Sequence, residues 1–316
     1  MKPLDLLTQV LELAAALVVA PLFLGWVNQC RAWLQNRRAP SIWLPYRGMR
    51  KLFHKEAVIA ENASPLFRLA PYVVFSAMVL AAGIIPSMGT RLPFTAAADA
   101  IALVGLLAMA RVFQSLAAMD IGTAFGTLGA RREMMVGFLA EPALLMIIFV
   151  ASMISATTAL PAIADNLATQ KLALYPSLAF TAVAFTLVFL AENARIPVDN
   201  PATHLELTMI HEATLLEYSA RHLALMEWAS ALKLFNYAGI GFALFVPWGV
   251  STATDSPATL LESVPLLVAK LAGAGAGLAL IETISAKLRV FRAPEFLASA
   301  FLFAMLGLLV HLLLGA

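Results

Sequence analysis

Long apolar runs separated by short polar segments dominate this chain of 316 residues. Each run is long enough for a helix to cross a membrane, because about 20 apolar residues span the hydrocarbon core. The runs are unbroken, without the alternation of apolar and polar residues that a transmembrane β-barrel needs. We therefore predict an all-α integral membrane protein that forms one polytopic domain over residues 1–316. About eight transmembrane helices are expected, near residues 5–28, 68–88, 96–118, 137–158, 173–191, 229–250, 264–285 and 296–315.

The composition and the distribution of charge support this interpretation. Hydrophobic residues make up 61% of the chain and charged residues 13%, with a mean hydropathy of +0.85, whereas soluble domains are roughly 45–50% apolar. Lys and Arg gather in the odd-numbered connections between the runs. Because basic connections stay in the cytoplasm, we expect both termini outside. The net charge of +2 therefore indicates topology and not affinity for nucleic acid.

Cysteine and histidine usage favours a chain that binds no cofactor of its own. Cys30 is the single cysteine, so no internal disulfide can form, and the sequence has no CxxC or CxxCH. Bis-histidine haem is disfavoured because three histidines share one segment and His311 is expected at the opposite side of the membrane. We predict no metal or cofactor in this chain.

The segment after the fifth predicted helix is the richest in titratable side chains. Prolines prevent that helix from simply continuing, and Asn200 can cap a new helix with Pro201 at its first position. On this helix His204 and His211 would share one face, joined by His222 if the helix is unbroken. The sequence thus predicts a helix at the membrane surface or inside a cavity.

Carboxylates and histidines in such a segment are suited to passing protons. Carboxylates partly removed from water have raised pKa values, and histidines titrate near neutrality. Apolar stretches border the segment, which favours a sheltered cavity over the alternative, a solvated cytoplasmic loop. We predict that the carboxylates line a hydrated cavity and that Arg195 holds one of them charged. The candidates here are Glu192, Arg195, Asp199, Glu206, His211, Glu212 and Glu217.

Charged residues within the predicted helices extend this hypothesis. A charge near the bilayer centre costs roughly 2.5–3.5 kcal/mol, so Arg111 and Glu141 each need a partner or a wet cavity. Glu133 or Glu141 could continue a buried acidic chain. Lys270 and Glu282 lie close to the ends of their predicted helix, and snorkelling explains both.

Glycine spacing indicates close contacts between helices. The pairs Gly122 and Gly126, and Gly273 and Gly277, have the spacing that lets two helices approach closely. Residues 122–133 form a glycine-rich connection, which is either a flexible link or a loop packed tightly against a partner.

The first cytoplasmic segment combines basic and aromatic residues. Its simplest role is to fix orientation and to meet anionic lipid. The alternative is a docking surface for a peripheral subunit, since Trp, Tyr and Arg anchor interfaces well. The docking candidates are Arg37, Arg38, Trp43, Tyr46, Arg47, Arg50 and Lys51.

Three stretches resemble a known family. ENARIPVDNPATHLELTMIHEA, RRAPSIWLPYRGMRKLFHKE and GTAFGTLGARREMM resemble the membrane subunit of group 4 nickel-iron hydrogenases, of the formate hydrogenlyase and hydrogenase-4 type. The resemblance implies a non-catalytic anchor in the bacterial inner membrane. Its implied partners are the hydrogenase large and small subunits, iron-sulfur protein subunits and antiporter-like membrane subunits, with the nickel-iron centre and the iron-sulfur clusters in those partners.

That family is in turn similar to the complex I subunit that forms the quinone cavity. There the loop has the form ExxRxPFD, followed by glutamates and EYSG. The matching residues here are Glu192, Arg195, Pro197, Asp199, Glu206 and the stretch 217–219. Val198 replaces the Phe, and Ala202 and His204 stand where acids are expected, which favours the hydrogenase branch. Two alternatives stay open: a quinone-site subunit of a complex I-like dehydrogenase, and a stand-alone ion transporter.

Overall fold

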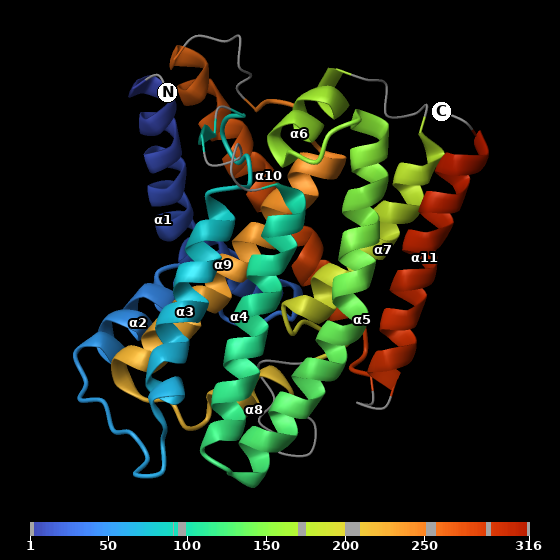
Figure 1. The fold of residues 1–316 in the computed structure, drawn as a ribbon. Helices are drawn as coiled ribbons and strands as arrows, with labels where there is room; N and C mark the ends of the chain where they lie inside the picture. Colours follow the sequence, from blue (N-terminus) through green and yellow to red (C-terminus); the bar gives the residue numbers. More distant parts are fainter. Residues whose placement is uncertain are drawn as a thin grey trace.

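The computed structural model describes residues 3–90, 92–93, 99–169, 175–199, 209–250, 257–288 and 292–314. Within these ranges the chain folds into eleven helices (Figure 1). They are α1 (Pro3–Leu34), α2 (Leu44–Phe53), α3 (Pro65–Ala82), α4 (Ala100–Asp120), α5 (Ala124–Ser155), α6 (Leu160–Thr169), α7 (Pro176–Glu192), α8 (His211–Leu215), α9 (Ala220–Phe245), α10 (Pro257–Ile284) and α11 (Ala293–Leu314).

Six of these helices are long and apolar enough to cross a membrane: α1, α3, α4, α5, α10 and α11. The prediction of an all-helical integral membrane protein is therefore confirmed, but the number of eight crossing helices is not. All eight predicted ranges overlap a helix, yet α7 has only 17 residues and α9 is too polar to count among the six.

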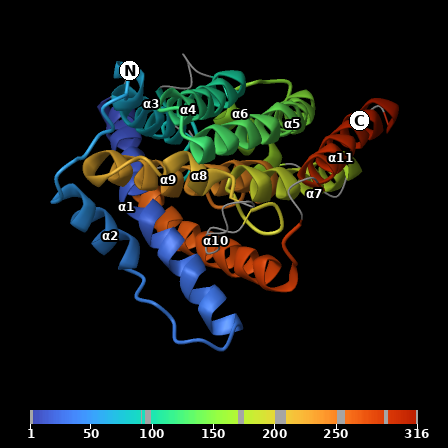
Figure 2. The same cartoon turned by 90° about the horizontal axis from the view of Figure 1, so that it is seen from below.

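The position of α9 explains its polarity. In Figures 1 and 2 it runs through the middle of the bundle, and it packs against α1 and α3. Polar side chains such as Lys233 and Asn236 therefore face protein. Asn236 is fully buried and donates a hydrogen bond to the Met78 carbonyl of α3 over 2.9 Å. A helix surrounded by other helices needs no lipid-compatible surface, so its hydropathy falls below that of its neighbours.

Glycines let several helices approach closely, though not at every predicted position. A Cβ at Gly126 would lie 2.7 Å from the Ala118 carbonyl oxygen, in keeping with the predicted close packing. On α10 it is Gly275 that packs, because a Cβ there would lie 3.0 Å from the Trp26 ring nitrogen of α1. Gly122, Gly273 and Gly277 have no described atom within 4 Å of such a Cβ, so the predicted close packing is not found at these three positions within the described chain.

Both ends of the chain lie at the same end of the bundle in Figure 1. The opposite end carries α2, α8 and the turn between α4 and α5. The short helix α2 lies beside α1 and α9, and the Tyr46 hydroxyl of α2 donates a hydrogen bond to the Val18 carbonyl. This end therefore gathers the segments that the sequence marks as basic and titratable.

Candidate functional site

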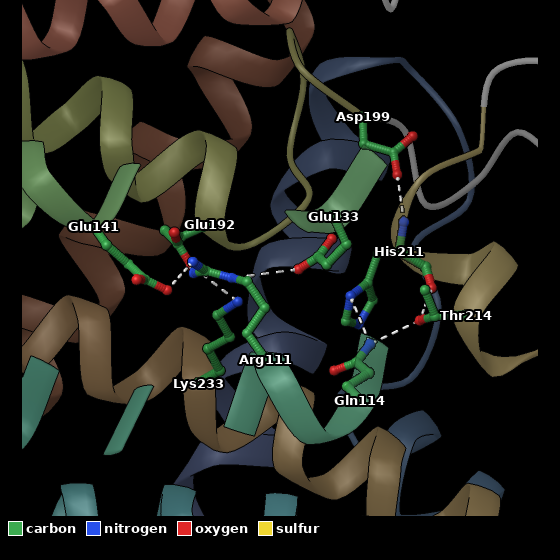
Figure 3. Close-up of polar contacts among 9 residues, drawn as sticks. All are labelled: Arg111, Gln114, Glu133, Glu141, Glu192, Asp199, His211, Thr214 and Lys233. Carbon is green, nitrogen blue, oxygen red and sulfur yellow. Dashed lines mark hydrogen bonds and ion pairs between the residues drawn. The ribbon is translucent and has the colours of Figure 1, made fainter. Parts of the chain in front are cut away.

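A cluster of five charged side chains lies between the helices, and we call it the central ion cluster (Figure 3). Arg111 of α4 is its centre and pairs with Glu141 of α5 and with Glu192 at the end of α7. Glu133 of α5 lies 3.9 Å from the Arg111 Nε. Lys233 of α9 lies 3.1 Å from the Glu192 Oε2. Four helices thus contribute side chains to one network.

The spacing of residues along α5 shapes this cluster. Glu133, Gly137 and Glu141 follow one another at intervals of four, so they share one face of the helix. Gly137 provides the space for the arginine, since a Cβ there would lie 2.6 Å from the Arg111 Cδ. The two glutamates therefore flank a gap that the Arg111 side chain fills.

The central ion cluster holds more negative than positive charge. Three carboxylates, of Glu133, Glu141 and Glu192, face the two cations Arg111 and Lys233. Arg111 and Glu192 are only 5% and 4% exposed, so water screens their charges poorly. The five side chains therefore carry one negative charge in excess.

A second group of charges, the loop ion cluster, fixes the segment that follows α7. Arg195 Nη1 lies 3.3 Å from Glu282 Oε1 of α10, and Arg31 of α1 lies 3.6 Å from the other oxygen of that carboxylate. Asp199 Oδ1 lies 3.3 Å from Lys287 Nζ. Burial lowers the pKa of Arg195, and the carboxylate of Glu282 opposes this shift. The segment is therefore held on α1 and on the end of α10.

Asp199 also organises the start of α8. Its Oδ2 accepts hydrogen bonds from the backbone N–H groups of Ile210 and His211, both over 3.2 Å. A carboxylate at this position also matches the positive end of the helix. Asp199 thus links the segment after α7 to the start of α8.

A cavity of about 410 Å³ lies between the loop ion cluster, α1, α2 and α9. Titratable and polar groups line it, including Arg195, Asp199, His211, Glu212 and Glu227. A smaller cavity of about 20 Å³ lies next to it and is lined by Arg111, Gln114, His211, Ser230 and Lys233, among others. That volume is enough for one water molecule. His211 and Ser230 line both cavities, so polar groups lead from the larger cavity to the central ion cluster.

Gln114 forms the link on α4. Its Nε2 donates a hydrogen bond to the Thr214 hydroxyl over 2.8 Å and lies 3.2 Å from the His211 Nδ1 (Figure 3). Gln114 lies three residues after Arg111 and so on the same side of α4. The His211 ring is therefore positioned between the large cavity and the arginine.

The predicted site residues separate into different environments. Asp199, His211, Glu212 and Arg195 line the large cavity. Glu192 does not, because its carboxylate is buried in the central ion cluster with the predicted Glu133 and Glu141. Glu217 is half-buried and is not among the residues that line this cavity. Glu206, His204 and the predicted helix start at Asn200 lie outside the described residues.

The structure changes three expectations for this region. Arg195 pairs with Glu282, which was not among the predicted acids, because α10 ends against the segment after α7. The Glu282 side chain is buried, so it does not snorkel. The unbroken helix that His222 would need to share a face with His211 is not present, since α8 ends at Leu215 and α9 starts at Ala220. His222 instead packs edge-on against Tyr72, with ring centroids 5.8 Å apart.

The sequence interpretation missed Lys233, Gln114 and Thr214 as members of the site. Lys233 carried a usable signal, because a lysine inside an apolar run needs a partner just as Arg111 does. Gln114 and Thr214 carried none, since a neutral polar side chain does not show in the sequence which partner it will bind.

The docking candidates form an exposed surface around α2. Trp43 and Tyr46 lie together, with ring centroids 5.8 Å apart, and Met49 holds the inner face of α2 in the protein. Tyr46 is half-buried and bonded to α1, so it positions the helix. The side chains that face outward are Arg37, Arg38, Trp43, Arg47, Arg50 and Lys51.

In the part of the chain that the structure describes, no group of three His, Cys, Asp or Glu side chains is arranged to hold a metal ion. Apolar helices long enough to span a membrane, packed around buried and paired charges, define an integral membrane protein. A family model described as NADH dehydrogenase matches residues 7–313. The chain belongs to this family.

Two curated relatives from Escherichia coli (strain K12) narrow the relationship. Hydrogenase-4 component C is 36% identical over 256 residues, which are 81% of this chain and 79% of the relative. Formate hydrogenlyase subunit 4 is 30% identical over 304 residues, which are 96% of this chain and 98% of the relative. These two relatives confirm the resemblance to the hydrogenase type of membrane subunit.

A solved structure shares the fold. It is a chain of the membrane-bound sulfane sulfur reductase, described as an archaeal respiratory membrane complex. The TM-score is 0.82 at 20% identity, and the match covers 96% of this chain and 98% of that chain. The arrangement of helices is therefore one that occurs in a respiratory membrane complex.

Proposed function

We propose that this chain is the membrane-anchoring and proton-coupling subunit of a membrane-bound nickel-iron hydrogenase complex. Its homology to hydrogenase-4 component C and formate hydrogenlyase subunit 4 supports this role. The chain itself is non-catalytic in this proposal. The nickel-iron centre and the iron-sulfur clusters belong to the large, small and iron-sulfur subunits. It lies in the bacterial cytoplasmic membrane, with its basic connections inside and both termini outside.

The observation that carries the coupling role is the charge imbalance of the central ion cluster. Three buried or half-buried carboxylates share two cations, so one proton brings the cluster to neutrality. His211 and Gln114 lie between this cluster and the large cavity, where a docked enzyme would deliver or take protons. Reversible protonation of the central ion cluster would link the reaction of the docked enzyme to the movement of charge in the membrane.

Glu141 is the group through which this charge would pass to a neighbour. Its side chain is 31% exposed, and exposed apolar residues surround it on α5, including Phe138, Leu145 and Phe149. A carboxylate exposed to lipid at this depth costs about 2.5–3.5 kcal/mol. An antiporter-like membrane subunit that covers this face removes that cost, so we assign this face of α5 to such a partner.

The test of coupling is Glu192→Gln, which removes one negative charge from the cluster and preserves its shape. Two cations then face two carboxylates, so assembly persists while the proton-binding capacity is lost. We expect the hydrogenase arm to co-purify normally, and proton translocation per turnover in proteoliposomes to fall about tenfold or more. Glu295→Gln, at an exposed position of α11, is the matched control. Unchanged translocation in Glu192→Gln would contradict the proposal.

Docking of the soluble arm is assigned to the exposed surface around α2. The outward side chains are five cations and a tryptophan, a combination suited to an acidic partner. The triple variant Arg47→Glu, Arg50→Glu, Lys51→Glu should release the hydrogenase subunits from washed membranes. Arg292→Glu, also exposed, should retain them. Retention in the triple variant would limit α2 to contact with lipid.

A quinone-site subunit of a complex I-like dehydrogenase is the second candidate. The size of the large cavity favours it, because about 410 Å³ falls within the range of small-molecule sites. If the chain is a quinone-site subunit, quinone should be retained during gentle purification and quinone-site inhibitors should stop activity. A quinone-free complex that still evolves hydrogen would exclude it.

A further inference from the structure

A second large depression, which we call the apolar groove, lies between α7, α9 and α10. Its volume is about 280 Å³, and its lining includes Phe185, Phe189, Phe242, Gly241 and Gly277. Among the described lining residues the one hydroxyl belongs to Thr186, which donates its hydrogen bond to the Ala182 carbonyl over 2.9 Å. The groove therefore offers hydrocarbon contacts and no hydrogen-bond donor to a ligand.

The two sides of the groove differ in shape. Phenylalanine rings form one side, with the Phe185 and Phe189 centroids 6.4 Å apart. Gly277 of α10 opens the other side, because a Cβ there would meet no described atom within 4 Å. A slot between aromatic rings and a glycine is suited to a slender, flexible chain.

A cation stands at one end of the groove. Lys270 Nζ donates a hydrogen bond to the Val246 carbonyl over 2.6 Å and lies 5.9 Å from the centroid of the Phe242 ring. Val246 and Phe242 both line the groove. An ammonium has three N–H donors, so Lys270 can bond an anionic oxygen as well as this carbonyl. Trp248, just beyond α9, is 49% exposed, which is typical of a tryptophan at the level of lipid headgroups.

We propose that the apolar groove binds one acyl chain of an anionic phospholipid, whose phosphate pairs with Lys270. Charge and shape together select this occupant, since a cation lies at the end of a narrow hydrocarbon slot. The far end of the groove is lined by Leu190 and Ile281. These residues lie close in sequence to Glu192 and Glu282 of the two ion clusters. The bound acyl chain therefore extends toward the ends of α7 and α10 that carry these carboxylates, and this proposal is independent of the proposed hydrogenase function.

The test uses the intact complex in nanodiscs and a phosphatidylglycerol with a diazirine in its acyl chain. Irradiation should label peptides that contain Phe189 or Phe242 in the native protein. Gly277→Leu fills the groove and should lower this labelling about tenfold, as expected when about two methylene groups lose their burial. Gly273→Leu is the matched control, because it lies on the same helix, is equally unobstructed and is not among the residues that line the groove.

The headgroup contact has its own test. Lys270→Gln should lower labelling by the phosphatidylglycerol probe about fivefold. It should change labelling by a phosphatidylcholine probe with the same acyl chain much less. If Gly277→Leu destabilises the complex, Ala274→Phe, at another lining position, fills the groove instead. Native-level labelling in an assembled filled variant, or capture of a partner helix in place of lipid, would overturn the proposal. Equal loss of both probes in Lys270→Gln would overturn the phosphate contact.

Discussion

Replacing Arg111 with methionine tests whether the central ion cluster is a set of ionised groups that depend on one another. Arg111 is 5% exposed and pairs with Glu133, Glu141 and Glu192. Methionine fills much of the same volume but carries no charge. The three carboxylates then face Lys233 alone, so the excess negative charge rises from one to two.

The expected loss follows from the burial of the partners that remain. Removing one partner of a buried ion pair destabilises a protein by about 3–5 kcal/mol, because the other charge is left uncompensated. Adding Glu192→Gln to Arg111→Met removes the most buried of the orphaned charges. The double variant should therefore recover about 1–3 kcal/mol relative to the sum of the two single changes.

Equilibrium unfolding of the purified protein in mixed micelles measures these differences. The matched control is Arg131→Met, at an exposed position of α5, which should change the free energy of unfolding by less than about 0.5 kcal/mol. A loss below about 1 kcal/mol in Arg111→Met, or strict additivity in the double variant, would refute the reasoning. Either result would mean that Glu192 is not held as an ion by Arg111.

Three further predictions concern the supports of the two clusters. Gly137→Ala crowds the Arg111 side chain and should lower the free energy of unfolding by about 1–3 kcal/mol, whereas Gly105→Ala, with open space around it, should raise it by about 0.5–1 kcal/mol. Asn236→Leu removes the side-chain hydrogen bond that the Met78 carbonyl accepts and should cost about 0.5–1.5 kcal/mol in the same assay; a neutral result would show that this hydrogen bond is dispensable. Asp199→Ala removes the acceptor of the Ile210 and His211 N–H groups, so hydrogen exchange of these two amides should accelerate about tenfold or more, while Asp120→Ala should leave them unchanged.

The helical architecture could be predicted because hydrophobic length is a local property of the chain. All eight predicted ranges overlap a helix in the structure. The number of crossing helices was less secure, because α9 tolerates Lys233 and Asn236 by packing against protein. A polar residue in a helix can face lipid or another helix, depending on tertiary contacts. The pattern of apolar residues in one helix does not show which of the two occurs.

The energetic cost of buried charge predicted the need for partners but not their identity. Arg111 and Glu141 were each expected to need a partner, and the structure pairs them with one another. Glu282 was assigned to the membrane surface because it lies near the end of its helix. That end of α10 turns toward the segment after α7, where Arg195 meets the carboxylate. A side chain near the end of a helix is therefore exposed only if no other part of the protein covers that end.

Part of the central ion cluster can be recognised from the amino-acid sequence. On α5 a glycine stands between two glutamates at intervals of four, so a helix presents acid, gap and acid along one face. Such a face has no stable state against lipid, because two carboxylates would be exposed beside a void. It requires a long cation from another helix, and Arg111 is the arginine within the preceding apolar run. The pairing of Lys233 with Glu192 has no comparable signal, since it depends on the path of the chain from α7 to α9.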